Sequence, residues 1–147
     1  SLVARRARGY RRTDDGWANA EHDNTTIYYS AGALYSTVGD LFRLDRALET
    51  DALLDARTRA LMFTHVVDTP RGGYTLGWNE GCLPLPDGRP FRFVGHVGDA
   101  SGFFAIVFRF PQTQDLIVML TNSDALNPRT GQTLLAAVAA IMNGPAR

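Results

Sequence analysis

The feature that most constrains this sequence is a group of three apolar segments in its C-terminal half, joined by short polar links. Phe, Val, Ile and Leu dominate them, a composition typical of strands, which we expect over residues 91–97, 103–110 and 116–121. The link at residues 112–115 is short enough for a hairpin, so we expect antiparallel pairing. A polar, glycine-rich turn with His96 at its lip leads into the second segment. A shorter strand is expected over residues 74–78, followed by a turn-rich connection at 84–90.

Apolar residues at helical spacing flank these strands and predict three helices. The first begins at Ser36 or Thr37 and has Asp40 in its first turn, where a carboxylate interacts favourably with the exposed amides. The other two are expected at residues 55–64 and 128–142. The apolar faces comprise Leu41, Phe42, Leu44 and Leu48 in the first helix, Leu61 and Met62 in the second, and Leu134, Leu135, Val138 and Ile141 in the third. Helices packed on an antiparallel sheet indicate an α+β fold.

The N-terminal part of the chain, residues 1–35, is polar and irregular, with a clear turn at 13–16. Arginine fills five of the eight positions from 5 to 12, a run that could bind nucleic acid or an anionic lipid. However, Asp14 and Asp15 follow at once, and the formal net charge of the chain is 0. A solvated strand edge is therefore the better interpretation of the basic run.

Several short phrases of this sequence occur together in one superfamily. They are His96-x-Gly98 with the later Gly102, Pro111 and Asn122, and the phrases at residues 7–10, 32–41 and 74–78. On these residues the chain resembles the C-terminal half of the serine β-lactamase-like hydrolases, which include class C β-lactamases, penicillin-binding proteins and related esterases. The resemblance implies the C-terminal part of the β-lactamase/transpeptidase-like fold. Residues 1–147 would then belong to a single domain, with 1–70 ending the helical subdomain and 71–147 forming the antiparallel strands and terminal helix.

The same resemblance implies a site around the His-x-Gly phrase. Acyl transfer in this superfamily needs a serine, a base and amides that hold the negative oxygen of the tetrahedral intermediate. Asp99 follows the glycine of the phrase and would supply one such amide from its backbone. Gly98 would leave room for the substrate's backbone, and His96 would donate a hydrogen bond to a tyrosine or to a substrate carboxylate. Gly102 would contribute to substrate binding.

The nucleophile of the superfamily is missing from these residues. It sits in Ser-x-x-Lys, but all 15 basic residues of this chain are arginine, whose guanidinium stays protonated and cannot act as the base. The second motif, Tyr-x-Asn, is also absent. Ser36 has no lysine after it and is better explained as a helix cap. We therefore expect a fragment that does not catalyse by itself.

Two function classes remain open at this point. The chain is either the C-terminal part of a serine hydrolase acting on an ester, amide or β-lactam, or a non-catalytic binding or scaffold module of the same fold. The upstream sequence separates them, because Ser-x-x-Lys followed by Tyr-x-Asn supports the enzyme.

The expected partners follow from the same reasoning. They are a small-molecule or peptide acyl substrate and the missing N-terminal half of the same protein, with no nucleic acid. An unpaired sheet edge would also favour a homo-oligomer. No metal or cofactor is expected, because His22, His65 and His96 are too dispersed for a ligand pattern. A periplasmic, secreted or cytoplasmic location all remain open.

Overall fold

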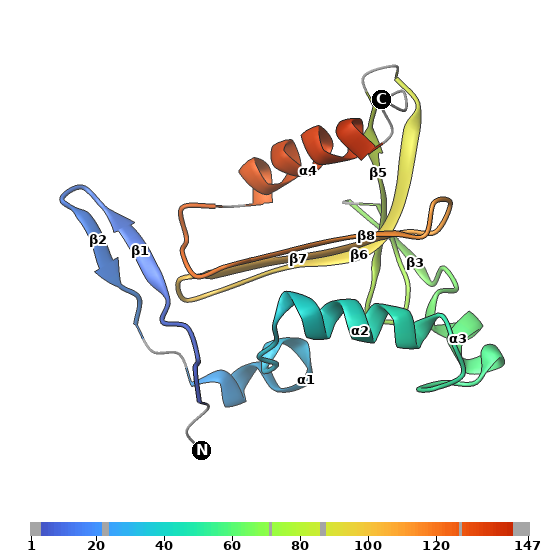
Figure 1. Cartoon of the computed structure of the whole chain (residues 1–147), viewed down its shortest axis with the longest axis horizontal. Coiled ribbons are helices and arrows are strands. Elements are labelled where there is room, and N and C mark those ends of the chain that lie inside the picture. Colours follow the sequence, from blue (N-terminus) through green and yellow to red (C-terminus); the bar gives the residue numbers. More distant parts are fainter. Residues whose placement is uncertain (1–3, 22–23, 71, 86–87, 127, 143–147) are drawn as a thin grey trace.

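The three apolar segments form one half of a six-stranded antiparallel sheet with the strand order β3-β4-β5-β6-β7-β8 (Figure 1). A computed structural model describes residues 4–21, 24–70, 72–85, 88–126 and 128–142 of the chain. The strands are β3 (Val67–Thr69), β4 (Gly72–Tyr74), β5 (Asn79–Pro84), β6 (Pro90–Ala100), β7 (Phe103–Phe110) and β8 (Asp115–Thr121). Helices α2 (Val38–Leu48) and α4 (Pro128–Met142) lie on opposite faces of β6–β8. The expected α+β fold with antiparallel strands and flanking helices is confirmed.

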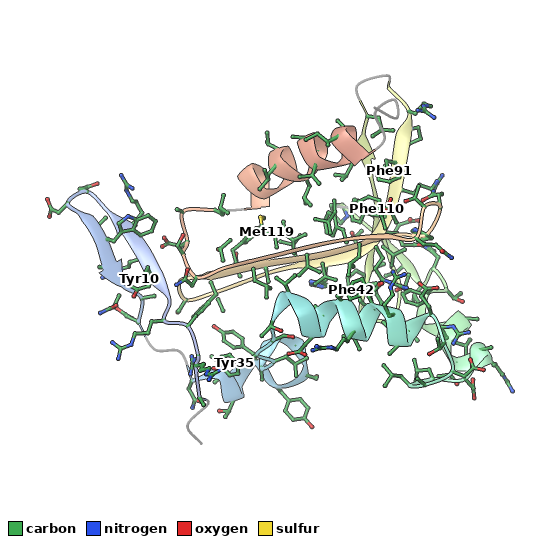
Figure 2. The ribbon with its side chains drawn as sticks, in the orientation of Figure 1. Tyr10, Tyr35, Phe42, Phe91, Phe110 and Met119 are labelled. Atoms are coloured by element: carbon green, nitrogen blue, oxygen red, sulfur yellow. The ribbon has the colours of Figure 1, made fainter. Side chains whose placement is uncertain are left out.

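One face of the sheet carries the main core and is covered by α4. Every second residue of β7 points to this side, as the period of a strand requires, and these residues are among the most buried of the described chain. The core cluster consists of Leu83, Leu85, Phe91, Phe104, Ile106, Phe108, Phe110 and Leu135. Figure 2 shows Phe91, Phe110 and Met119 on this side of the sheet. Gly131 lets α4 come close, because a Cβ there would lie 2.9 Å from the ring of Phe104.

Cross-strand aromatic pairs hold β6 to β7 within this core. The rings of Phe91 and Phe110 stack with centroids 4.2 Å apart, and those of Phe93 and Phe108 with centroids 4.0 Å apart. Such pairs stabilise a sheet beyond the area that they bury.

The boundaries of α4 match the expected 128–142, but its apolar face is only partly used. Leu135 is buried against the sheet, whereas Leu134 and Ile141 are exposed. Of the apolar face expected for this helix, Leu135 is thus the residue buried in the core, and Leu134 and Ile141 lie outside it.

Helix α2 begins after Thr37, whose hydroxyl oxygen accepts the N–H of Asp40 at 3.1 Å. The same hydroxyl donates to the Asp40 carboxylate, and this hydrogen bond, followed by that from Arg43, lowers the pKa of Asp40 below its ordinary value. The cap is therefore Thr37 and not Ser36. Leu48 is buried on the sheet, while Phe42 and Leu44 remain exposed.

A buried ion pair fixes α2 to the sheet. Asp45 projects from the helix and is only 3% exposed, and its carboxylate accepts a hydrogen bond from Nε of Arg109 on β7. Arg109 also donates to Glu49, and Arg46 donates to the second oxygen of Asp45 and to the carbonyl oxygen of Gln114. The helical periodicity places Asp45 on the apolar face, beside Leu41 and Leu48, but it does not reveal the partner on β7.

The strand expected at residues 74–78 is wrong beyond its first residue. β4 ends at Tyr74, and the chain turns there, with the N–H of Thr75 donating to the carbonyl oxygen of Trp78 at 2.8 Å. Gly77 in this turn has a φ of +92°, a conformation that favours glycine. The chain then enters β5. The sequence analysis assigned no strand to residues 79–83, and residue 84, expected to begin the connection, is the last residue of this strand.

Helix α3 (Ala56–Met62) lies within the expected residues 55–64. Asp55 caps it by accepting the N–H of Thr58 at 2.7 Å, which is the largest cause of its lowered pKa. Leu61 is exposed, so the expectation that it faces inward is wrong.

The N-terminal region contains more regular structure than expected. β1 (Tyr10–Thr13) and β2 (Gly16–Asn19) form a separate hairpin, followed by the 3₁₀ helix η1 (Thr25–Tyr28) and α1 (Tyr29–Gly32). The hairpin is attached to the end of β8, because the N–H of Tyr10 donates to the carbonyl oxygen of Asn122 at 2.9 Å. Figure 2 shows Tyr10 on this hairpin. None of the described helices is long and apolar enough to span a membrane.

Replacing Asp45 by alanine should destabilise the chain strongly. The change leaves the buried guanidinium of Arg109 without its main partner, and breaking such a pair typically costs about 3–5 kcal/mol of unfolding free energy. Replacing both Asp45 and Arg109 by leucine should restore a large part of the loss. Urea unfolding measures both, with Arg43→Ala as a control, because the exposed Arg43–Asp40 pair should contribute little to stability. If Asp45→Ala lowered the unfolding free energy no more than the control does, the ion pair would not fix α2 to the sheet.

His65 forms ion pairs with residues of β5 and β3. We expect these pairs to make the stability of the chain depend on pH. Nδ1 of His65 lies 2.7 Å from Oε2 of Glu80 on β5, and Nε2 lies 3.7 Å from Oδ1 of Asp68 on β3. The hydrogen bond to Glu80 is the largest cause that raises the pKa of His65 above its ordinary 6.5. Because the folded pKa is raised, this stabilisation is fully present below the unfolded pKa and is lost as the pH rises through the folded pKa.

The variant Glu80→Gln should therefore lower the pKa of His65 and should destabilise the chain more at about pH 5.5 than at about pH 8.5. NMR titration of His65 and urea unfolding at the two pH values test this. Glu21→Gln, at an exposed carboxylate, is the matched control. An equal loss of stability at both pH values would mean that the protonated pair is not formed.

Candidate active site

The His-x-Gly phrase lies inside a strand and not at its end. β6 continues to Ala100, and the turn that follows is the two-residue loop of Ser101 and Gly102. On the other edge of β6, the partner strand β5 reaches only to Asn79, which pairs with Gly95. Within the described residues, β6 beyond Gly95 is thus paired with β7 alone. We call the unpaired side of residues 96–100 the open edge.

Backbone amides point outward along the open edge. Ala100 and Phe103 flank the two-residue loop, so they exchange hydrogen bonds, and hydrogen-bonded pairs then alternate along the ladder. Val97 and Asp99 therefore direct their backbone N–H and C=O groups away from β7. The Val97 carbonyl agrees with this, because its oxygen lies 2.7 Å from Nδ1 of the His96 ring. The Asp99 amide thus lies at an accessible strand edge, and its role there stays a prediction.

The two glycines of this half-strand have different reasons to be glycine. At Gly95 an added Cβ would overlap the carbonyl oxygen of Val107, so the position is required by close packing. At Gly98 an added Cβ would meet nothing within 4 Å, and the φ of Gly98 is not positive. Neither backbone conformation nor packing among the described residues requires glycine at position 98.

His96 sits on the α2 side of the sheet, opposite Val107 of β7, and is exposed. Its Nε2 lies 3.2 Å from the hydroxyl of Tyr74, and the two rings meet edge to face with centroids 6.2 Å apart. Sequence reasoning did not select Tyr74 as a site residue. The phrase at residues 74–78 contains it, but that phrase was interpreted as a strand and as part of the family resemblance, and not as part of a site.

A small apolar hollow of about 160 Å³ adjoins His96 between α2 and the sheet. Most of its wall is aliphatic or aromatic, and the charged side chains that reach it, Asp45 and Arg109, are paired with each other. The lining residues are Leu41, Leu44, Asp45, Leu48, Gly77, Trp78, His96, Val107 and Arg109. The open edge is therefore bordered on one side by a surface that suits an apolar group.

Gly102 lies in the two-residue turn that follows the open edge. Its φ is +72°, and an added Cβ would lie 2.5 Å from the Cβ of Ala20 and 2.6 Å from the amide nitrogen of Tyr10. The residue is buried against the N-terminal segment, so its glycine is explained by this packing. The structure brings His96, Gly98 and Asp99 together and does not bring Gly102 to the same surface. A role for Gly102 in substrate binding stays a prediction that this packing does not favour.

Metal-ligating side chains do not cluster in the described part of the chain. No group of three or more His, Cys, Asp or Glu residues there is arranged to hold a metal ion. The residues at the open edge offer backbone amides, an imidazole and a phenol, which suit hydrogen bonding and proton transfer.

Comparison with known proteins places this arrangement in a family. The structure is similar to the crystal structure of a D-stereospecific amidohydrolase from Streptomyces sp., with a TM-score of 0.70 and 21% identity over 99% of this chain and 42% of that chain. It is also similar to a penicillin binding protein from Bacillus halodurans, with a TM-score of 0.67 and 23% identity over 95% of this chain and 41% of that chain. At these identities the likeness is one of fold. No curated protein matches the chain.

The family model described as Beta-lactamase matches residues 1–141, which is nearly the whole chain. The chain spans 42% and 41% of the two solved relatives. With its antiparallel sheet between α2 and α4 and its His-x-Gly strand, this chain belongs to the Beta-lactamase family.

Proposed function

We propose that the open edge of β6 is one wall of an acyl-transfer site that hydrolyses an ester, amide or β-lactam through a serine acyl-enzyme. In this proposal Asp99 supplies a backbone amide to the oxyanion, Gly98 gives the substrate room, and His96 faces the reacting group. The observation that carries the proposal is the outward-directed amide of Asp99 beside a glycine that packing does not require.

The open edge has the properties that an extended acyl substrate needs. An unpaired strand edge binds an extended chain through its backbone groups, and Val97 and Asp99 both present theirs. An amide held in place before the reaction stabilises the charge that develops on the substrate oxygen, and such a donor is typically worth about 3–4 kcal/mol of activation free energy. A side chain at position 98 would project from the strand into the space beside these amides.

The nucleophile must come from a segment outside these residues, because the chain has neither lysine nor Ser-x-x-Lys. The two solved relatives are more than twice as long as the part that this chain matches. We therefore place the serine and its base in a further segment of the same protein, and we expect the 147-residue chain alone to be inactive. One relative is an amidohydrolase by its printed name, which supports an amide among the candidate substrates.

A non-catalytic binding module of the same fold is the second candidate. The observation in its favour is the absence of a nucleophile motif from the sequence. The coding sequence upstream separates the two candidates, because a module would carry no Ser-x-x-Lys and Tyr-x-Asn there.

The 147-residue chain should not hydrolyse nitrocefin or p-nitrophenyl acetate above the buffer rate. A longer chain from the same gene with Ser-x-x-Lys should do so, and Gly98→Val in it should lower kcat/KM at least about tenfold, equal to about 1.4 kcal/mol. His96→Ala should lower turnover strongly and should change the melting temperature little. Covalent labelling of a serine in the short chain by a penicillin or fluorophosphonate probe would overturn the assignment of the nucleophile.

Gly95 provides the matched control for the Gly98 experiment. In the 147-residue chain Gly95→Ala should lower the melting temperature, because its Cβ would overlap the backbone of β7. Gly98→Ala should leave the melting temperature nearly unchanged, because nothing lies within 4 Å of its Cβ. If Gly98→Ala destabilised the chain as much as Gly95→Ala, its glycine would have a structural reason and the main support for the site would be lost.

The exposed apolar side chains near α1 support a further part of the proposal, that another polypeptide surface covers this region. Leu34 is 90% exposed, Tyr29 82% and Ile27 71%, which is unusual for a solvated surface. We propose that the N-terminal half of the same protein covers them, and that the isolated chain self-associates instead. Light scattering at micromolar concentration should show oligomers of the 147-residue chain. A monomer that stays soluble when concentrated would argue against both forms of cover.

A further inference from the structure

The imidazole of His96 is held at both of its nitrogens. Nδ1 lies 2.7 Å from the carbonyl oxygen of Val97, and Nε2 lies 3.2 Å from the hydroxyl oxygen of Tyr74. A carbonyl oxygen only accepts hydrogen bonds, so Nδ1 carries a proton. In the neutral ring Nε2 then bears a lone pair, and the Tyr74 hydroxyl is the donor. The expectation that His96 donates to a tyrosine or to a substrate carboxylate did not concern Tyr74 and stays a prediction.

The backbone, and not the hydroxyl contact alone, fixes the position of Tyr74. Tyr74 is the last residue of β4 and pairs with Asn79, which pairs in turn with Gly95 beside His96. Its carbonyl oxygen accepts the N–H of Val66 at 2.9 Å. The ring is half-buried and meets the imidazole edge to face at an interplanar angle of 83°. A phenol anchored in this way can hold the imidazole in place.

The charged groups beside His96 are engaged elsewhere. Asp45 and Arg109 line the same hollow but bind each other, with Arg46 and Glu49 as their further partners. Tyr74 is therefore the group that the structure gives to Nε2. The Val97 carbonyl fixes the proton on Nδ1, and the Tyr74 hydroxyl, as the donor to Nε2, holds the direction of the ring.

The geometry points to Tyr74 as a positioning residue of the proposed acyl-transfer site: its hydroxyl donates to Nε2 and, together with the Val97 carbonyl at Nδ1, holds His96 in the Nδ1–H form. Without that hydroxyl the ring is free to rotate and to place a proton on Nε2. Nε2 would then present a donor to the open edge in place of a lone pair. The catalytic importance of this arrangement rests on the proposed function, whereas the tautomer of His96 does not.

The test uses the 147-residue chain labelled with ¹⁵N-histidine, in which the nitrogen chemical shifts report the tautomer directly. In the unaltered chain near neutral pH, Nδ1 of neutral His96 should carry the proton. Tyr74→Phe keeps the aromatic edge but removes the donor, so a population with the proton on Nε2 should appear. Tyr29→Phe is the control, because Tyr29 is 82% exposed, and it should leave the His96 signals unchanged.

A proton on Nε2 of neutral His96 in the unaltered chain overturns the inference even if Tyr74→Phe does not fold. Unchanged His96 signals in a folded Tyr74→Phe chain overturn it as well. In a longer, active chain, Tyr74→Phe should lower kcat between about ten- and a hundredfold with little change in KM, as expected for a misplaced catalytic group. An unchanged kcat there rejects the positioning role. If the tautomer responds but the longer chain hydrolyses nothing, the proposed function fails while the pairing of Tyr74 with His96 stands.

Discussion

The architecture depends on one buried interaction, the ion pair between Asp45 of α2 and Arg109 of β7. A carboxylate and a guanidinium are tolerated in a protein interior only when each has a partner, and here each has more than one. The pair holds α2 against the face of the sheet that α4 does not cover. The hydrophobic contribution to this face is modest, because Phe42 and Leu44 remain exposed and Leu48 alone of these is buried.

The ion pair between Asp45 and Arg109 also shapes the surroundings of the site. Asp45 and Arg109 form part of the hollow beside His96, so the same interaction that fixes α2 defines one wall of that space. On the other side, Tyr74 approaches from β4. His96 is thus bordered by a neutralised ion pair and by a phenol, in surroundings that are largely apolar. The ring itself is exposed, so its direction depends on its two hydrogen bonds, to Val97 and to Tyr74.

The open edge exists because β5 begins only at Asn79. Had β5 extended past Asn79, its backbone would occupy the groups of Val97 and Asp99 that now face outward. The turn from Thr75 to Trp78 prevents this, because the chain folds back there toward β4. The chain belongs to the Beta-lactamase family, and the binding of a substrate at this edge stays a proposal, as does the reaction.

Local patterns in the sequence were sufficient to predict the boundaries of β7 and α4. β7 and α4 have the expected boundaries, because a period of two and a period of 3.6 are properties of a segment by itself. The accessible positions of His96 and Asp99 could also be expected, since the glycine-rich phrase marks them. The tertiary structure alone decided the rest. Asp45 meets Arg109 across 64 residues of chain, and Tyr74 meets His96 across 22, so no local period can reveal either contact. Both exist because strand pairing and helix docking bring distant segments together, and there a buried charge or an imidazole nitrogen must find a partner.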